Sequence, residues 1–293
     1  MINYNRNSIK KILLIKNDKI GDMVVSSNVF REIGKAFPKS KITAIVSKSN
    51  KSLIEKSPYI HNLLVLNSSP KGYKQIKEYL NMAMKLRREK FDLGIDLRGS
   101  FYNILFLLFL ANVKHRIGFY HQNFSKVFLH YGLAKDRYSG KHCVPLRLEL
   151  LNNALGLKST NYWPEIPTDK EDEKILNEFL KKNRMKKIIS IVPDASYEEK
   201  QWPLERWNAL IKSLNKKYPK YSIVITGRDE NKIDYLVKRN KKAIFPKPRV
   251  NKDLRVVYLL FKKSSLIIAH DGGPMHMAWA SKSPVIALML KNL

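Results

Sequence analysis

The regular alternation of short apolar runs with longer helical stretches is the feature that most constrains the fold. The runs KILLIK (11–16), KITAIVS (41–47) and NLLVLN (62–67) have the length of strands, and the segments between them carry apolar residues at helical spacing. Strands that alternate with helices form right-handed βαβ units, whose strands lie parallel in one sheet. The sequence therefore predicts an α/β fold.

The alternation continues along the whole chain and is interrupted once, between residues 158 and 172, by two prolines and a polar run. We predict a domain boundary there, with residues 1–160 and 161–293 as two Rossmann-like, doubly wound domains. Further strands are expected at 91–100, 114–119, 186–193, 221–227, 243–245, 265–270 and 284–289. Helices are expected at 23–37, 73–90, 101–113, 142–157, 171–183, 203–217, 230–239, 252–263 and 274–282.

The charge is strongly positive, with 55 Lys and Arg residues against 25 Asp and Glu, for a formal net charge of +30. Such a charge attracts nucleic acid, anionic lipid headgroups or phosphorylated sugars. The lysines are spread along the whole chain, and no common nucleic-acid-binding motif is present. We therefore expect no nucleic-acid partner, and we keep nucleic-acid binding as a minor alternative that rests on the charge alone.

Two apolar stretches bear on membranes, and neither has the length of a span. The N-terminus has only a short apolar run before charged residues, and FYNILFLLFLANV (101–113) falls short of the about 20 residues that a transmembrane helix needs. A buried helix is the main interpretation of 101–113, and a membrane-touching face is the alternative. The single cysteine, Cys143, excludes an internal disulfide and is typical of a reducing compartment, so we expect a cytoplasmic protein.

A predicted strand ends at residue 270 and is followed by Asp271-Gly272-Gly273-Pro274, after which a helix begins. Glycines at this position let a ligand approach the backbone, and the amide groups and partial positive charge of a helix start attract anions such as phosphate. His276 is placed to donate one more hydrogen bond. The alternative is that Asp271 only caps the helix and His276 only packs.

Two more strand ends carry candidate residues for a phosphorylated ligand. Ser196 and Lys200 follow the strand at 186–193, and a hydroxyl with a lysine suits the charge of a diphosphate. Glu230 follows the strand at 221–227, where a carboxylate accepts hydrogen bonds from ribose hydroxyls; it is preferred over Asp229. A surface lysine in a lysine-rich protein is the alternative for Lys200.

In the first half, NDKIGD (17–22) places Asp22 at a predicted helix start. A carboxylate there either caps the helix or takes a proton from an acceptor hydroxyl. The chain has no P-loop and no GxGxxG after its first strand, which argues against a dinucleotide-dependent oxidoreductase. No cluster of residues has the spacing of a metal site.

Five segments, in this order, resemble the family 9 glycosyltransferases, the bacterial ADP-heptose:lipopolysaccharide heptosyltransferases. They are KILLIKNDKIGDMVVSSNVFREIGKAFP, FDLGIDLRGS with HRIGF, KHCVPLRLELLNNALGL, VPDASYEEKQWPLERW and HDGGPMHMAWASKSPVIAL. The resemblance covers nearly the whole chain. It implies the GT-B fold, in which two Rossmann-like domains face a cleft, and a metal-independent, inverting transfer of a heptose or similar sugar from a nucleotide sugar.

The resemblance also implies roles for the candidate residues. Asp22 would be the general base on the acceptor hydroxyl, and Glu230 would bind the ribose of the donor, which the resemblance implies to be ADP-heptose. The donor diphosphate would be held by Ser196, Lys200, Asp271, Gly272, Gly273 and His276. The implied partners are a nucleotide sugar, a glycolipid acceptor of the lipopolysaccharide core and an anionic membrane surface. The protein is expected to be a monomer that is peripheral on the inner face of the cytoplasmic membrane and has no cofactor.

Three departures from the family pattern qualify these expectations. Asp194 stands where the family usually has glycine, so that a carboxylate enters a loop expected to face phosphate, and Gly272 stands where a hydroxyl residue is usual. The sequence ends in VIALMLKNL, where the family normally continues with a Gly-Pro loop and further helices, so a truncated C-terminus is expected. A non-catalytic remnant that binds a nucleotide or an anionic lipid is therefore the alternative.

Overall fold

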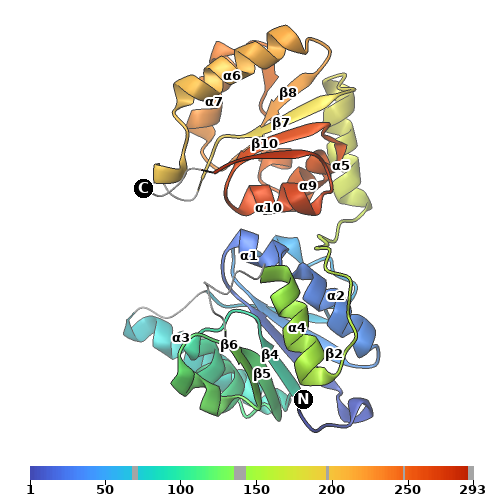
Figure 1. The fold of residues 1–293 in the computed structure, drawn as a ribbon, viewed down its shortest axis with the longest axis vertical. Helices are drawn as coiled ribbons and strands as arrows, with labels where there is room; N and C mark the ends of the chain where they lie inside the picture. The colour runs from blue at the N-terminus through green and yellow to red at the C-terminus, as the bar shows by residue number, and fades with distance from the viewer. Residues whose placement is uncertain (68–71, 135–142, 196–197, 247, 290–293) are drawn as a thin grey trace. The chain divides into compact units, whose positions relative to one another are not determined.

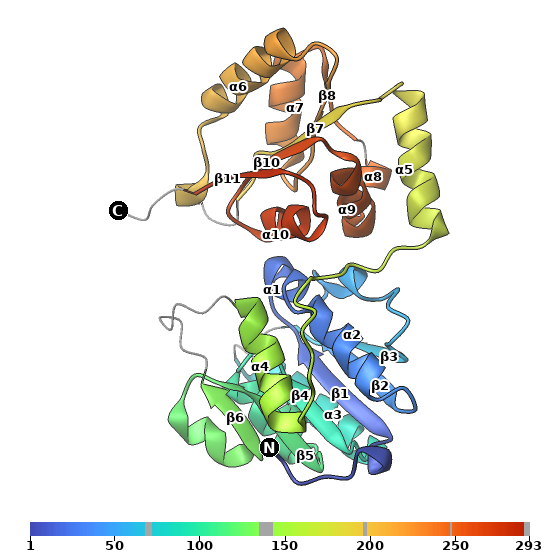
Figure 2. The same ribbon diagram turned by 45° about the vertical axis from the view of Figure 1, so that its right-hand side comes forward.

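The computed structural model describes residues 1–67, 72–134, 143–195, 198–246 and 248–289. The chain divides into two compact units, Met1–Glu165 and Ile166–Leu293. Each unit contains one parallel sheet with helices on both faces (Figures 1 and 2). The predicted α/β class, with two doubly wound sheets, is confirmed.

The first sheet has the strand order β3-β2-β1-β4-β5-β6, and every neighbouring pair is parallel. Leu13 and Ile15 of β1 pack against α3 and η3 on one face of the sheet. Ile12 and Leu14 are fully buried on the opposite face, where Figure 2 shows α2 and α4. Burial on both faces explains why this strand is apolar throughout. The strands are β1 Lys11–Lys16, β2 Lys41–Val46, β3 Asn62–Val65, β4 Leu93–Asp96, β5 His115–Tyr120 and β6 Tyr131–Ala134.

Helices connect these strands across the sheet. The α-helices of the first unit are α1 Ile20–Val24, α2 Ser27–Ala36, α3 Tyr73–Glu89 and α4 Cys143–Leu155. The shorter or wider helical segments are η1 Arg6–Ser8, η2 Lys51–Leu53, η4 Asn123–Phe128 and the π-helix η3 Asn103–Leu110. The apolar stretch 101–113 thus forms a largely buried helix packed on α3, as its main interpretation predicted. Within the described residues, no helix has the length and apolarity needed to cross a membrane.

The first unit differs from the predicted one in two details. The helix expected over 23–37 is two helices, because the Ser26 hydroxyl donates to the Asp22 carbonyl at 2.6 Å and the Ser27 hydroxyl donates to the Val24 carbonyl at 2.7 Å. Such side-chain bonds compete with the helical backbone and break it here. Strand β6 was not predicted, because its four residues YGLA are only partly buried and lack an apolar pattern.

The second sheet has the order β11-β10-β7-β8-β9, again with parallel neighbours. Ile223 and Ile225 of β8 pack on the face that α6 and α7 cover, whereas Val224 points to the face of α5 and α9. The strands are β7 Ile188–Val192, β8 Ser222–Ile225, β9 Ala243–Ile244, β10 Leu266–His270 and β11 Val285–Leu288. The helices are α5 Lys170–Lys182, η5 Glu198–Lys200, α6 Leu204–Lys217, α7 Glu230–Arg239, α8 Pro248–Asn251, α9 Leu254–Lys263 and α10 Gly273–Ala280. Helix α9 begins after the N-cap Asp253, so the helix expected from residue 252 starts slightly later.

On the side of the first unit, Arg31, Ser27 and Asn28 of α2 bond to the residues that lead to the junction. The guanidinium of Arg31 donates to the carbonyl of Asn161 at 2.9 Å and to that of Trp163 at 3.1 Å, and it pairs with Glu165 at 3.2 Å. These bonds hold residues 161–165 on α2, which is why the first unit ends at Glu165. The predicted boundary lies between residues 160 and 161. Helix α5 then begins with a capping box between its N-cap Asp169 and Asp172.

Candidate functional site

Asp22 lies in the first turn of α1, directly after the carboxyl end of β1. Its side chain is 44% exposed, and a carboxylate oxygen lies 3.8 Å from the guanidinium of Arg147 on α4. The N-cap of α1 is Lys19, and no side chain caps this helix. Helix capping by Asp22 is therefore wrong, and the carboxylate is an accessible acid beside a cation.

A second cation lies beneath this carboxylate. Lys16, the last residue of β1, is completely buried, and its ammonium group donates to Asp18 at 2.6 Å and to the carbonyl of Leu97 at 3.2 Å. Burial lowers the pKa of Lys16, and the negative charges of Asp18 and Asp22 oppose that effect. The end of β1 therefore holds a compact group of two acids and two bases.

A buried polar network fixes the neighbouring strand ends. Asp96, the last residue of β4, accepts hydrogen bonds from the side chain of Asn103 at 3.0 Å and from the backbone amide of Gly99 at 2.9 Å. Burial raises the pKa of Asp96, while these hydrogen bonds act in the opposite direction. Asn103 also donates to Asn17 at 2.9 Å, which in turn donates to the hydroxyl of Tyr79 at 3.1 Å. Burial raises the pKa of Tyr79 to about 12, so this hydroxyl stays protonated.

Lys16 and Arg147 were not predicted from the sequence. Each interrupts an apolar pattern: Lys16 ends a buried strand, and Arg147 lies on α4 among the buried residues Val144, Leu148 and Leu151. A charged residue at a position that the pattern assigns to the core is rarely left without a partner. That mismatch is the signal by which both residues could have been found.

In the second unit, the loop after β10 leads through Asp271 and Gly272 into α10. The N-cap of α10 is Gly272, and no side chain caps the helix, so the alternative that Asp271 is a helix cap is wrong. Gly272 has an extended backbone, and a Cβ atom added to it would meet only Pro274, at 3.9 Å. The first turn of α10 is therefore not covered by a side chain from this position. His276 lies in the same helix, partly buried, and its amide donates to the Gly272 carbonyl at 3.2 Å.

The loop after β7 brings Lys200 to this turn. The Lys200 ammonium donates to the Asp271 carboxylate at 2.7 Å, and the two side chains are 27% and 36% exposed. Ser196, which the sequence analysis assigned to the same loop, lies outside the described residues. The two loops thus meet through an ion pair that solvent reaches.

His270, the last residue of β10, contacts the loop that follows β7. Its Nε2 accepts a hydrogen bond from the amide of Trp202 at 2.9 Å, and its ring lies edge-on to Trp207 with centroids 5.1 Å apart. Burial lowers the pKa of His270, so the neutral imidazole that accepts this hydrogen bond is the favoured form. His270 was not singled out from the sequence.

The loop after β8 carries Glu230, the first residue of α7. Its neighbour Asp229 is the N-cap and accepts from the amides of Asn231 at 3.1 Å and Lys232 at 3.2 Å. Glu230 makes no such cap; its carboxylate is 44% exposed and lies 3.4 Å from the ammonium of Lys252. Of these two acids, Glu230 is therefore the one available to a ligand.

The carboxylate of Asp194 is directed to the loop after β8. It accepts hydrogen bonds from the backbone amides of Arg228 and of Asp229, the latter at 3.0 Å. Gly227 makes this approach possible, because a Cβ atom there would overlap the Asp194 carboxylate. Asp194, expected to bring negative charge to a phosphate-facing loop, instead bonds one loop of the second sheet to its neighbour.

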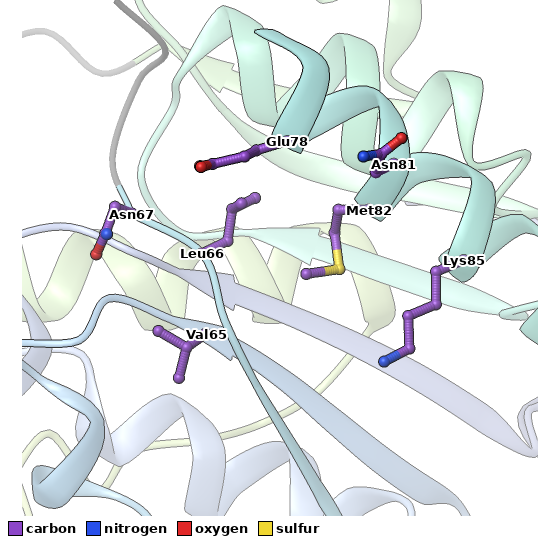
Figure 3. Close-up of a pocket in the computed structure, with 7 residues that line it drawn as sticks. All are labelled: Val65, Leu66, Asn67, Glu78, Asn81, Met82 and Lys85. Atoms are coloured by element: carbon purple, nitrogen blue, oxygen red, sulfur yellow. The ribbon is translucent and has the colours of Figure 1, made fainter. Parts of the chain in front are cut away.

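The structure thus brings most of the predicted residues of the second unit to one edge. Lys200, Asp271, Gly272, Gly273 and His276 form one continuous group, and Glu230 follows β8, the strand next to β7. Asp22 lies in the other unit. No cluster of three or more side chains suited to a metal ion occurs among the described residues. Figure 3 shows a separate hollow of about 430 Å³ in the first unit, between the end of β3 and α3, and none of the predicted residues lines it.

Comparison with known proteins bears on what this arrangement does. The sequence model of glycosyltransferase family 9 (heptosyltransferase) matches residues 79–290. Lipopolysaccharide heptosyltransferase 2 of Salmonella typhimurium is 23% identical, with 95% of this chain and 82% of that protein aligned. Lipopolysaccharide heptosyltransferase 1 of Campylobacter coli is 24% identical, with 95% and 83% aligned.

Solved structures agree with the fold. A family 9 glycosyltransferase from Veillonella parvula superposes with a TM-score of 0.80 at 20% identity, covering 95% of this chain and 80% of the other. The ADP-heptose lipopolysaccharide heptosyltransferase II of E. coli gives a TM-score of 0.76 at 20% identity, covering 94% and 84%. Since the family model spans well over half of the sequence, the chain belongs to glycosyltransferase family 9 and is a glycosyltransferase of the heptosyltransferase type.

Proposed function

We propose that this protein transfers a heptose, or a similar sugar, from a nucleotide sugar to a glycolipid acceptor of the lipopolysaccharide core. ADP-heptose is the first donor to test, because a related E. coli heptosyltransferase was solved with ADP and with a fluorinated ADP-heptose. The transfer is inverting and needs no metal ion, as its similarity to family 9 implies. The protein acts as a monomer, peripheral on the inner face of the cytoplasmic membrane.

One observation carries the donor site: the Lys200–Asp271 ion pair beside the first turn of α10, where Gly272 adds no side chain. A diphosphate would take the place of the Asp271 carboxylate on the Lys200 ammonium and accept hydrogen bonds from the amides after Gly272. His276 and Ser196 would add donors to the same anion. Glu230 would accept hydrogen bonds from the ribose hydroxyls.

The acceptor side of the reaction rests on Asp22. Its carboxylate would take the proton of the acceptor hydroxyl as the hydroxyl oxygen bonds to the anomeric carbon. The bond from that carbon to the diphosphate breaks at the same time, and ADP leaves with the electron pair. Charge grows on the diphosphate in the transition state, so Lys200 and the α10 amides stabilise the transition state more than the bound donor. Arg147, 3.8 Å from the Asp22 carboxylate, helps to hold it in place, and the buried Lys16 adds positive charge to the same strand end.

The proposal is tested by incubating the protein with ADP-heptose and a deacylated lipopolysaccharide core. Release of ADP and the mass of the product are followed without added metal and with a chelator. We expect a product heavier by one heptose unit, with equal rates in both conditions. A rate that depends on added metal, or release of ADP without a glycosylated product, would contradict the proposed chemistry.

A further inference from the structure

Four phenylalanine rings form one connected cluster at the β5–β6 side of the first sheet. The centroids of Phe101 and Phe124 are 5.0 Å apart, those of Phe109 and Phe128 are 4.9 Å apart, and Phe101 lies 6.2 Å from Phe128. The rings come from η3, η4 and the residues just before η3. A cluster of this size normally lies in a core.

The outer members of this cluster face solvent. Phe109 is 42% exposed and Phe124 is 55% exposed, and the neighbouring Val127 of η4 is 76% exposed. Single exposed apolar residues are ordinary, but a contiguous group of them marks an interaction site. We call Phe109, Phe124 and Val127, with Phe101 and Phe128 beneath them, the aromatic surface.

The chain around the aromatic surface carries positive charge only. No Asp or Glu occurs between residues 97 and 135, although the whole chain has 25 of them in 293 residues. The same segment contains the cations Arg98, Lys114, Arg116, Lys126 and Lys135. Lys126 is exposed on η4 between Phe124 and Val127, and the guanidinium of Arg116 lies 5.5 Å from the centre of the Phe109 ring. Exposed apolar side chains next to cations, in a segment of the chain that contains no acid, match an anionic lipid headgroup layer.

We propose that the aromatic surface is the membrane-docking face of this protein, with Phe109, Phe124 and Val127 entering the headgroup layer while the exposed Lys126 binds lipid phosphates. This inference rests on the proposed glycolipid acceptor and says how that acceptor is reached. Phe101 and Phe124 follow the carboxyl ends of β4 and β5, and Asp22 follows the carboxyl end of β1 in the same parallel sheet. Phe109 lies near the start of β5, where Arg116 meets its ring, so the aromatic surface extends along the β5–β6 side of the sheet. Docking through this surface keeps the unit that carries Asp22 at the membrane, where a lipid-linked sugar is anchored.

Two other occupants fit the surface less well. A second copy of the chain would place one basic surface against another, and like charges oppose such a pairing. Single-stranded nucleic acid stacks on the open faces of aromatic rings. Here the rings meet one another at interplanar angles of 66° and 64°, and the most exposed member is the aliphatic Val127.

The test is co-sedimentation of the full chain with vesicles of phosphatidylglycerol and phosphatidylcholine, or of phosphatidylcholine alone. Binding is repeated at about 0.5 M salt, where screening removes most of the long-range attraction of a basic protein. The variants are the pair Phe124→Ser and Val127→Ser, the charge reversal Lys126→Glu, and Tyr162→Ser as a matched control, since Tyr162 is 48% exposed in the same unit.

We expect binding to the anionic vesicles that persists in part at high salt. The double variant should lose that salt-resistant binding by roughly tenfold or more, as the removal of two inserting apolar groups implies, while Tyr162→Ser stays within about twofold of the parent. Lys126→Glu should weaken binding at low salt. Equal binding of the double variant and the parent overturns the proposal, as does a failure of the parent to bind anionic vesicles.

Two companion measurements separate the alternatives. A dimer in sedimentation, or RNA binding, that the double variant abolishes would assign the aromatic surface to that partner and overturn membrane docking. Transfer to a deacylated, water-soluble acceptor should be unchanged in the double variant. Vesicle binding without any such transfer in the parent protein would count against the proposed function and leave the docking face intact.

Discussion

The carboxyl edges of the two sheets place similar charged groups in opposite environments. At the first edge, Lys16 and Asp96 are fully buried, and their partners are fixed by hydrogen bonds within the fold. At the second edge, the side chains of Lys200 and Asp271 are 27% and 36% exposed, and the turn beside them contains two glycines. A buried ion pair cannot be exchanged for a ligand, whereas a solvated pair can.

The difference suggests a division of work between the edges. Preorganised charges suit a group that must be held in place while protons move, and exchangeable charges suit a site that admits and releases an anion. If this division is correct, removal of one charged group at the first edge changes turnover and the free energy of unfolding. The same change at the second edge changes the affinity for the ligand.

The largest effect is expected for Asp22→Asn, which keeps the shape of the side chain and removes its basicity. If Asp22 is the base, turnover falls by roughly 10²–10⁴-fold, and the affinity for ADP stays close to that of the parent. Steady-state rates and calorimetry measure the two quantities. Asp234→Asn, at an exposed acid of α7, is the control and should leave turnover unchanged. Turnover of Asp22→Asn within a few-fold of the parent would remove Asp22 from this role.

The next effect concerns Lys16→Met, which leaves Asp18 and the Leu97 carbonyl without their buried partner. Breaking one side of a buried ion pair costs about 3–5 kcal/mol of unfolding free energy. Urea denaturation followed by circular dichroism measures that loss, and hydrogen exchange across β1 assigns it to the first unit. Lys200→Met is the matched change at the second edge, and should cost less than about 1 kcal/mol because its pair is solvated. Similar losses in the two variants would contradict the comparison.

Lys200→Ala is expected to change the free energy of ADP binding, by less than Lys16→Met changes the free energy of unfolding. Loss of a charge-assisted contact to phosphate weakens ADP binding by about 1.5–3 kcal/mol. Calorimetric titration with ADP is the measurement, and Lys212→Ala, at an exposed lysine of α6, is the control for net charge. If Lys200→Ala leaves the ADP dissociation constant unchanged, Lys200 does not bind the donor as proposed.

The smallest effect is a dependence on pH at the second edge. Burial lowers the folded-state pKa of His270 below its ordinary value of about 6.5, so the stability it contributes is fully present above that pH and is lost as the pH falls through the lowered value. Protonation would also remove the acceptor of the Trp202 amide. We expect a stability difference of about 1 kcal/mol between the parent and His270→Gln at neutral pH, which shrinks on acidification. Tryptophan fluorescence reports it, because Trp202 and Trp207 lie next to His270; a difference independent of pH would refute it.

The sequence was sufficient for the architecture because the central strands of both sheets are buried on both faces. Strands such as β1 and β8 are apolar runs of the expected length, and the helices between them show clear helical spacing. It was insufficient for β6, whose residues are half exposed, and for the break at Ser26, where side-chain hydroxyls bond to the backbone. Such local competition leaves no trace in hydrophobic periodicity.

The candidate site was also only partly predictable from the sequence. Lys200 and Asp271 were both predicted, since each follows a strand end, and only the structure shows that they pair with one another. Lys16 was missed because a lysine in a lysine-rich chain is expected on the surface, yet its side chain is wholly buried. The direction of the Asp194 carboxylate depends on the absence of a side chain at Gly227, 33 positions away, and no local pattern encodes that.

The anchoring of residues 161–165 by Arg31 has a mechanical consequence for the chain. Because Glu165 is held on α2 and α5 starts after its cap Asp169, only residues 166–169 lie between the two anchored ends, and Ile166 among them is buried. A tether of four residues reaches at most about 14 Å when fully extended. A Gly-Ser segment inserted after Glu165 would lengthen this connection without altering either sheet, so it separates any contribution of connection length to turnover from the chemistry of each unit.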